Sequence, residues 1–143
     1  MKRKFISFYF DIAERTAKLS HAIRLQVGAV IVKDDRILSY GYNGMPAGLP
    51  NTCEEDVGGV LITKPEVIHA EMNAIMKLAR NGDSCRNSVM FITHAPCVEC
   101  AKLILQSGID RVYYMHDYRS KSGIDLLSIG GVEVMKYEES IIS

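Results

Sequence analysis

The chain has 143 residues, of which 48% are hydrophobic and 24% are charged, and its 17 basic residues balance its 17 acidic ones. This composition excludes a disordered chain, no apolar run is long enough to cross a membrane, and zero net charge argues against a dedicated nucleic-acid binder. Four cysteines are too few for a disulfide scaffold, so their positions matter more than their number. We expect one cytoplasmic domain over residues 1–143, with neither a membrane nor a nucleic acid as partner.

The first third of the chain predicts a helix followed by a hairpin. Residues 27–32 form an apolar, β-branched run that is typical of a strand covered on both faces, and residues 36–40 return as a second strand. Asp34 and Asp35 form the turn between them. The helix before this hairpin runs to about Leu19, and the side chains expected to face the core are Phe5, Phe8, Ile12, Ala13 and Leu19.

The middle of the chain predicts a loop and an irregular segment. Residues 41–50 are dense in glycine and proline, which is typical of loops that bring backbone close to a ligand. Residues 51–65 show no clear period, and we expect irregular structure there.

The second half of the chain alternates helices and strands. The expected elements are a helix with core residues from Ile68 to Ala79, a strand at 88–93, a helix at 97–107, a strand at 111–115, a short helix at 125–129 and a last strand at 132–137. Strand–helix–strand alternation requires parallel neighbours with right-handed crossovers. Together with the first hairpin, this predicts an α/β fold, a three-layer α/β/α sandwich with a mixed five-stranded sheet.

Two short stretches carry metal-binding chemistry. His69 and Glu71 lie at the start of one predicted helix, and Cys97 and Cys100 lie at the start of the next, 28 positions after the histidine. A Cys-x-x-Cys at a helix start directs both sulfurs to one point, where the helix dipole favours thiolates. With the histidine they give three zinc ligands and leave the fourth position for water, the catalytic arrangement. Glu71 is then placed to move the proton of that water.

Other interpretations of these residues exist. A lone Cys-x-x-Cys is also found in redox pairs and in structural zinc sites, and a histidine two residues before a glutamate is common by chance. A structural site needs a fourth ligand, but Cys53 and Cys85 form no second Cys-x-x-Cys. A redox pair needs neither His69 nor Glu71. The combination therefore favours catalytic zinc, with Cys53 and Cys85 as free thiols.

The two stretches, H-A-E at 69–71 and P-C-V-E-C at 96–100, resemble the signature of the zinc-dependent cytidine deaminase superfamily. The resemblance implies that His69, Cys97 and Cys100 hold zinc. It also implies that Glu71 takes a proton from water and delivers protons to the ring nitrogen and the departing amine. The reaction expected from it is hydrolytic attack on C4 of cytosine, or on the equivalent carbon of another base.

Further motifs are similar to those of deoxycytidylate (dCMP) deaminases. They are Q-V-G-A-V-I-V from Gln26, G-Y-N-G-M-P-A-G from Gly41, H-A-E-M-N-A-I from His69 and C-A-K-L-I-L-Q-S-G-I from Cys100, within a resemblance from about Gln26 to Tyr137. The implied reaction converts dCMP and water to dUMP and ammonia and supplies dUMP for thymidylate synthesis.

The resemblance also implies roles for individual residues. Asn43 binds the deoxyribose, for which the alternative is a turn residue in the left-handed conformation. The substrate pocket is expected to contain Ala70, Thr93, His94, Ala95 and Tyr118. Candidates for the 5′-phosphate are Tyr118, Arg119, Arg24 and Gln26, although such side chains near loops are often only solvated.

Relatives of this kind are typically homohexamers that dCTP activates and dTTP inhibits, with magnesium on the effector triphosphate. The residues expected at the effector site are Gly41, Tyr42, Asn43, Gly44, Lys77 and Arg80, where the last two are equally consistent with a solvated helix face. Some phage-type relatives carry a second, structural zinc. Here His21 and Cys53 have no evident further partners, which argues against a second zinc.

Rival functions share part of the pattern. A tRNA adenosine deaminase is expected to show a basic surface, which the balanced charge contradicts. A nucleoside cytidine deaminase usually has cysteine in place of the ligand histidine, and a guanine or riboflavin-pathway deaminase leaves the Gly41 motif unexplained. A non-catalytic, zinc-stabilised binding module has no need of Glu71.

Overall fold

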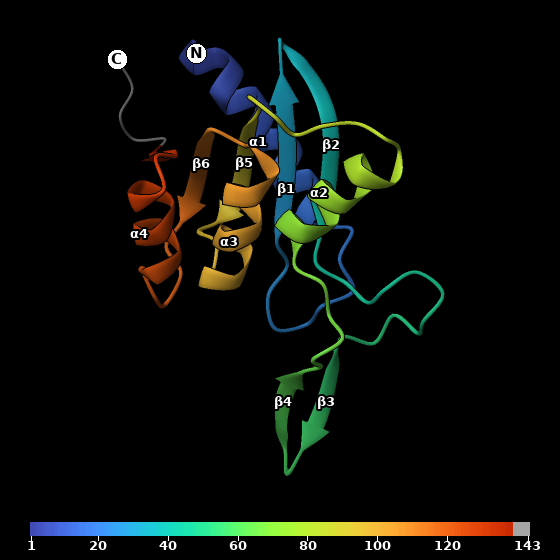
Figure 1. Ribbon diagram of the computed structural model, residues 1–143. Helices are drawn as coiled ribbons and strands as arrows, with labels where there is room; N and C mark the ends of the chain where they lie inside the picture. The colour runs from blue at the N-terminus through green and yellow to red at the C-terminus, as the bar shows by residue number, and fades with distance from the viewer. Residues whose placement is uncertain (139–143) are drawn as a thin grey trace.

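A twisted five-stranded sheet forms the centre of the fold, in a computed structural model that describes residues 1–138 (Figure 1). Its strands are β1 (Gly28–Lys33), β2 (Arg36–Tyr42), β5 (Val89–His94), β6 (Arg111–His116) and β7 (Glu133–Lys136). Their order across the sheet is β2-β1-β5-β6-β7. β1 is antiparallel to both of its neighbours, whereas β5, β6 and β7 run parallel. The predicted mixed sheet is confirmed.

Helices cover both faces of this sheet (Figure 1). They are α1 (Arg3–Ala17), α2 (Ala70–Arg80), α3 (Val98–Ser107) and α4 (Ser122–Ile129). α1 packs on β1, β2 and β5 from one side, and α2, α3 and α4 form the layer on the other side. The three-layer sandwich is therefore confirmed. Within the described part of the chain, no helix has the length and apolar character needed to cross a bilayer.

The layer formed by α1 corrects one prediction about the core. The buried residues of α1 are Tyr9, Phe10, Ala13, Thr16 and Ala17, whereas Phe8 is 52% exposed. Successive helical residues are about 100° apart, so a face centred on Phe10 and Ala13 leaves Phe8 on the opposite side of the helix. The helix also ends at Ala17, which leaves Leu19 outside it and 44% exposed. The expectation that Phe8 and Leu19 face the core was wrong.

Two glycines let helices approach the sheet closely from opposite faces. A Cβ atom on Gly28 would lie 2.1 Å from the Ala13 carbonyl oxygen of α1, and one on Gly41 would lie 2.4 Å from the Ala70 carbonyl oxygen of α2. Neither distance is possible for a real side chain. Gly28 and Gly41 therefore allow the backbones of α1 and α2 to rest directly on the β1–β2 pair.

The segment predicted to be irregular contains a second sheet. β3 (Glu54–Val57) and β4 (Val60–Thr63) pair antiparallel and project from the body of the molecule (Figure 1). Gly58 and Gly59 both have positive φ, as the tight turn of a two-residue hairpin requires. The Gly-Gly pair, followed by the apolar run Val60–Thr63, was the signal for this hairpin. The loop predicted at residues 41–50 begins two residues later than expected, because β2 continues through Tyr42.

We predict that Gly28→Ala destabilises the protein by about 2 kcal/mol or more, because the new methyl group must displace the backbone of α1. Urea unfolding followed by circular dichroism measures this change. Gly44→Ala is the matched control: Gly44 has no positive φ, and the nearest atom to its added Cβ lies 3.9 Å away. Equal unfolding midpoints for the two variants would contradict the close packing of α1 on β1.

Candidate metal centre and its cavity

Three nitrogen and sulfur donors meet at one point of the structure. The ligand atoms of His69, Cys97 and Cys100 all lie within 4.8 Å of one another. His69 Nδ1 is 3.6 Å from the Cys97 sulfur and 3.3 Å from the Cys100 sulfur. A tetrahedral zinc ion with bonds of about 2.3 Å to sulfur and about 2.0 Å to nitrogen would separate these atoms by about 3.6 Å. The donor set and its spacing therefore fit zinc.

The starts of α2 and α3 place these donors. His69 is the N-cap residue of α2 and Cys97 is the N-cap residue of α3, both with extended backbone, and Cys100 lies in the first turn of α3. Two backbone hydrogen bonds between Gly44 and Ile68 fix the chain just before His69. The amide of Ala95 donates to the His116 carbonyl and fixes the chain just before Cys97. The sheet thus holds both helix starts in register.

The thiols are electrostatically unequal. Hydrogen bonds from Cys100 and His69 lower the pKa of the Cys97 thiol to about 3, so Cys97 is a thiolate. The neighbouring Cys97 sulfur and burial raise the pKa of Cys100. The hydrogen bond with Cys97 raises the pKa of His69. The Cys97 thiolate lies at the positive end of α3, where the helix dipole stabilises it and where it can bind a metal cation.

Glu71 is a buried carboxyl group beside these donors. It lies in the first turn of α2, is only 4% exposed and lines the same cavity as His69 and Cys97. Burial raises its pKa, and contacts with its own backbone amide and with His69 partly oppose that rise. A carboxyl group whose pKa is raised in this way can both accept and return a proton.

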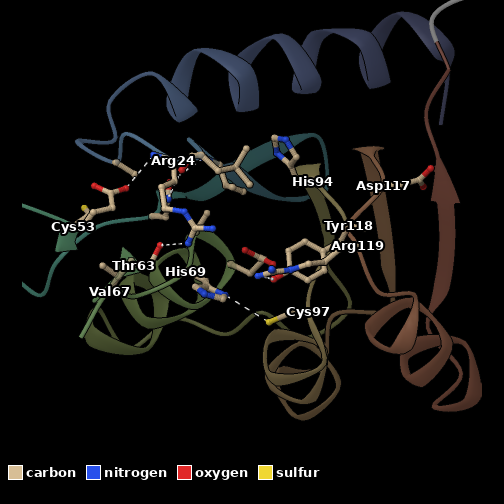
Figure 2. Close-up of a pocket in the computed structure, with 18 residues that line it drawn as sticks. Arg24, Cys53, Thr63, Val67, His69, His94, Cys97, Asp117, Tyr118 and Arg119 are labelled. Carbon is tan, nitrogen blue, oxygen red and sulfur yellow. Dashed lines mark hydrogen bonds between the residues drawn. The ribbon is translucent and has the colours of Figure 1, made fainter. Parts of the chain in front are cut away.

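The donors open onto a cavity of about 530 Å³, a size typical of small-molecule sites (Figure 2). Most of the residues singled out from the sequence as metal, catalytic or substrate residues meet there. Those that line the cavity are Arg24, Asn43, His69, Ala70, Glu71, His94, Ala95, Cys97, Tyr118 and Arg119. Figure 2 shows Arg24 and Thr63 on one side of His69, with Tyr118 and Arg119 on the other.

Asn43 is tied to the segment before β1. Its side-chain oxygen accepts from the Val27 amide at 2.9 Å, and its side-chain nitrogen donates to the Leu25 carbonyl at 2.8 Å. Asn43 is not in the left-handed conformation, so the alternative interpretation as a left-handed turn residue was wrong. One N–H of the Asn43 amide remains available to a ligand in the cavity.

Thr93 and His94 occupy different environments. Thr93 is 3% exposed and lies outside the cavity lining, and its hydroxyl accepts from the Gly28 amide and contacts His94 Nδ1 at 2.9 Å. His94 itself lines the cavity and stacks at a tilt on His116. Burial lowers the pKa of His94, which favours the neutral ring. Thr93 thus orients the His94 ring from the side that faces away from the cavity.

The remaining candidates from the sequence lie outside the cavity lining. Gln26 donates to the Ser20 carbonyl, and Gly41 is covered by α2. The Lys77 ammonium group lies 3.7 Å from the centre of the Tyr40 ring, at a separate hollow of about 370 Å³ between β2 and α2. The predicted effector residues that line neither space are Gly41, Tyr42, Gly44 and Arg80.

The structure adds residues that the sequence analysis missed. Glu54 and Thr63, from the base of the β3–β4 hairpin, line the cavity. Gly123, at the start of α4, packs so closely that a Cβ there would lie 2.1 Å from the Pro96 carbonyl oxygen. Recognising the hairpin from its Gly58-Gly59 turn would have indicated that Glu54 and Thr63 pair at its base. No pattern in the sequence around Gly123 indicated its contact with Pro96.

A three-layer α/β sandwich with this donor group and carboxyl defines a zinc-type metal centre open to a small-molecule cavity. The family model for the cytidine and deoxycytidylate deaminase zinc-binding region matches residues 3–116. The chain therefore belongs to this deaminase family.

Individual relatives agree with this assignment. The structure of the dCMP deaminase of cyanophage S-TIM5, in complex with dCMP and dUMP, superposes with a TM-score of 0.90 at 43% identity, covering 96% of this chain and 99% of that one. The deoxycytidylate deaminase of enterobacteria phage T4 is 35% identical over 168 aligned residues, covering 90% of this chain and 87% of that enzyme. ComE operon protein 2 of Bacillus subtilis is 40% identical over 118 residues, but the match spans only 61% of its length.

We predict that the purified protein holds one zinc ion per chain and that Cys97→Ala and Cys100→Ala each remove most of it, because two remaining ligands bind zinc weakly. Metal analysis after dialysis measures the content. Cys85→Ala is the matched control, since Cys85 is buried in the core outside the donor group. Stoichiometric zinc in either of the first two variants would exclude that cysteine as a ligand.

Proposed function

We propose that this protein is a dCMP deaminase, a single catalytic domain that converts dCMP and water to dUMP and ammonia and so supplies dUMP for thymidylate synthesis. The observation that carries the proposal is the buried Glu71 carboxyl beside the His69, Cys97 and Cys100 donors in one cavity. Support for the substrate comes from the S-TIM5 relative, which is a dCMP deaminase solved with dCMP and dUMP.

Glu71 performs the proton transfers in this proposal. A bound zinc ion supplies the chemistry of lowering the pKa of water. The Glu71 carboxylate takes one proton from the attacking water and passes it to the ring nitrogen next to the carbon that is attacked. It then takes the second proton and passes it to the amino group, which leaves as ammonia. The carboxylate ends as it began, and water and dCMP are converted to dUMP and ammonia without an oxidant or reductant.

The cavity residues orient the nucleotide. Ala70 and Ala95 have only methyl side chains, which leaves room for a flat base near Glu71. The Ala95 amide is used by the His116 carbonyl, so its own carbonyl is the group that can accept from the base amino group. Asn43 donates its remaining amide N–H to the deoxyribose, and Tyr118 contributes its ring to the lining of the same cavity. Thr93 acts through His94.

Regulation and assembly form a second part of the proposal. A homohexamer in the cytoplasm, activated by dCTP with magnesium and inhibited by dTTP, is what the resemblance to dCMP deaminases implies. Local support is limited to Lys77, whose ammonium group lies against Tyr40 beside the hollow between β2 and α2. Gly41 and Tyr42 lie in β2 beneath that helix, and Arg80 lies one turn beyond Lys77.

We predict that Glu71→Gln lowers kcat by about 10³-fold or more while zinc content is unchanged, because the amide can neither accept nor return a proton. Release of ammonia measures turnover. Glu99→Gln is the matched control: Glu99 lies in the first turn of α3, between the two cysteine donors, but pairs at the surface with Lys102. Substantial deamination by Glu71→Gln would exclude Glu71 as the proton carrier, and a zinc-stabilised binding module would show no turnover even in the wild-type protein.

We predict that dCMP has the highest kcat/KM in a panel of dCMP, CMP, deoxycytidine and a tRNA substrate. Preference for the tRNA would instead favour an adenosine deaminase.

The same deamination assay with dCTP and magnesium, or with dTTP, tests regulation. We predict that Lys77→Gln weakens the response to dCTP without changing the basal rate. A response that is unchanged in Lys77→Gln would remove this residue from the effector site.

A further inference from the structure

The sequence contains two asparagines that are followed by glycine, Asn43 before Gly44 and Asn81 before Gly82. Asparagine in such a pair can lose its side-chain amide, because glycine has no side chain to shield its backbone nitrogen from the asparagine Cγ atom. The glycine nitrogen attacks that carbon, so the asparagine side chain and the peptide plane between the two residues must rotate toward each other. The hydrogen bonds that hold each pair therefore decide which of the two reacts.

Asn43 is hydrogen-bonded at its backbone amide, its carbonyl and both side-chain polar atoms. The side chain is held on both sides, and the backbone amide donates to the Val27 carbonyl at 3.3 Å. The Asn43 carbonyl accepts from the Ser20 hydroxyl at 2.6 Å, and the Gly44 amide donates to the Ile68 carbonyl at 3.0 Å. The peptide plane between Asn43 and Gly44 is thus fixed at both ends, and it cannot rotate without breaking several bonds at once.

Asn81 is held more loosely. It is the exposed C-cap residue of α2, and among residues 1–138 neither its side chain nor its carbonyl has a hydrogen-bond partner. Its backbone amide donates to the Leu78 carbonyl at 3.1 Å, and the Gly82 amide donates to the Ala79 carbonyl at 3.2 Å. No atom lies within 4 Å of a Cβ placed on Gly82, so the turn has no close packing around it. Rotation here breaks bonds only at a helix end, where local opening costs least.

We propose that Asn81 is a site of spontaneous deamidation and that the fold protects Asn43 from the same reaction. The Gly82 nitrogen forms a bond to Asn81 Cγ, the bond from Cγ to the side-chain nitrogen breaks, and ammonia leaves with the proton of the Gly82 amide. Water then opens the cyclic imide at either carbonyl and gives aspartate or isoaspartate. Water is consumed and ammonia is released, without an oxidant or reductant. Neither zinc nor Glu71 takes part, so this inference does not depend on the proposed function.

Deamidation of Asn81 changes the end of α2. It adds a negative charge to the hollow between β2 and α2, which Asn81 and Lys77 both line. The helix dipole disfavours a carboxylate at this end, and isoaspartate adds a backbone carbon just before Gly82, whose φ of 76° shapes the turn. We therefore expect the last turn of α2 to loosen as the protein ages. The same change at Asn43 would place a carboxylate in the cavity that contains Glu71.

The test follows both asparagines in one protein during incubation at mildly alkaline pH in heavy-oxygen water. Digestion in ordinary water and peptide mass spectrometry then count only the acids formed during the incubation, because these carry heavy oxygen. In the folded, zinc-loaded full chain, Asn81 should convert about 10-fold or more faster than Asn43, since more hydrogen bonds must break at Asn43. In urea the two should convert at similar rates. Equal rates in the folded protein, or conversion of Asn81 only after unfolding, would overturn the proposal.

Two variants test the two parts of the proposal. Asn81→Gln should abolish conversion at this position, because glutamine must close a larger ring, and its unfolding midpoint should stay constant while that of the wild-type protein falls with incubation. Ser20→Ala removes the hydroxyl that holds the Asn43 carbonyl and should raise the rate at Asn43 by about 5-fold, the effect of one hydrogen bond. An equal fall of the midpoint in Asn81→Gln would refute the role of Asn81. An unchanged rate at Asn43 in Ser20→Ala would refute its protection by the fold.

Glu71→Gln separates this reaction from the enzyme's own chemistry. This variant should convert Asn81 at the wild-type rate, and a slower conversion would refute a spontaneous reaction. A chain that deaminates dCMP but keeps Asn81 intact would refute this inference and leave the proposed function standing. A chain that converts Asn81 but does not deaminate dCMP would refute the function alone.

Discussion

The structure depends on the meeting of two helix starts. His69 and Cys97 each cap a helix, so the metal donors are fixed as well as the backbone that carries them. Two short backbone attachments, Gly44 to Ile68 and Ala95 to His116, connect those helix starts to the sheet. A change of one residue in either connection would move a donor by several ångström, far more than tetrahedral coordination tolerates.

Opposing electrostatic effects act on Glu71. The start of α2 stabilises its carboxylate through the helix dipole, whereas burial stabilises the neutral acid. Burial is the larger effect and raises the pKa. At Cys97 the balance is reversed, because hydrogen bonds outweigh burial and the thiol ionises. Two helix starts of similar geometry thus favour the anion at Cys97 and the neutral acid at Glu71.

The sequence allowed the metal donors and the sheet to be predicted because both are encoded locally. His69, Cys97 and Cys100 lie in short motifs, and strand 27–32 has a continuous apolar pattern. The outward position of Phe8 could not be predicted, because several helical faces of α1 are apolar and packing on β1 selects one of them. The contacts of Arg24 depend on Glu54 and Thr63, which are 30 and 39 positions away in the sequence. Gly123 was missed because its neighbour, Pro96, is distant in the sequence.

The base and the tip of the β3–β4 hairpin are under different structural constraints. Only its base reaches the cavity, and within residues 1–138 its two strands pack chiefly on each other. Nothing lies within 4 Å of a Cβ placed on Gly58 or Gly59 at its tip. Doubling the length of such a loop costs only about 0.6 kcal/mol in closure entropy. The tip is therefore where this chain can accept inserted sequence, such as a tag or a fluorescent reporter, without moving the base of the hairpin.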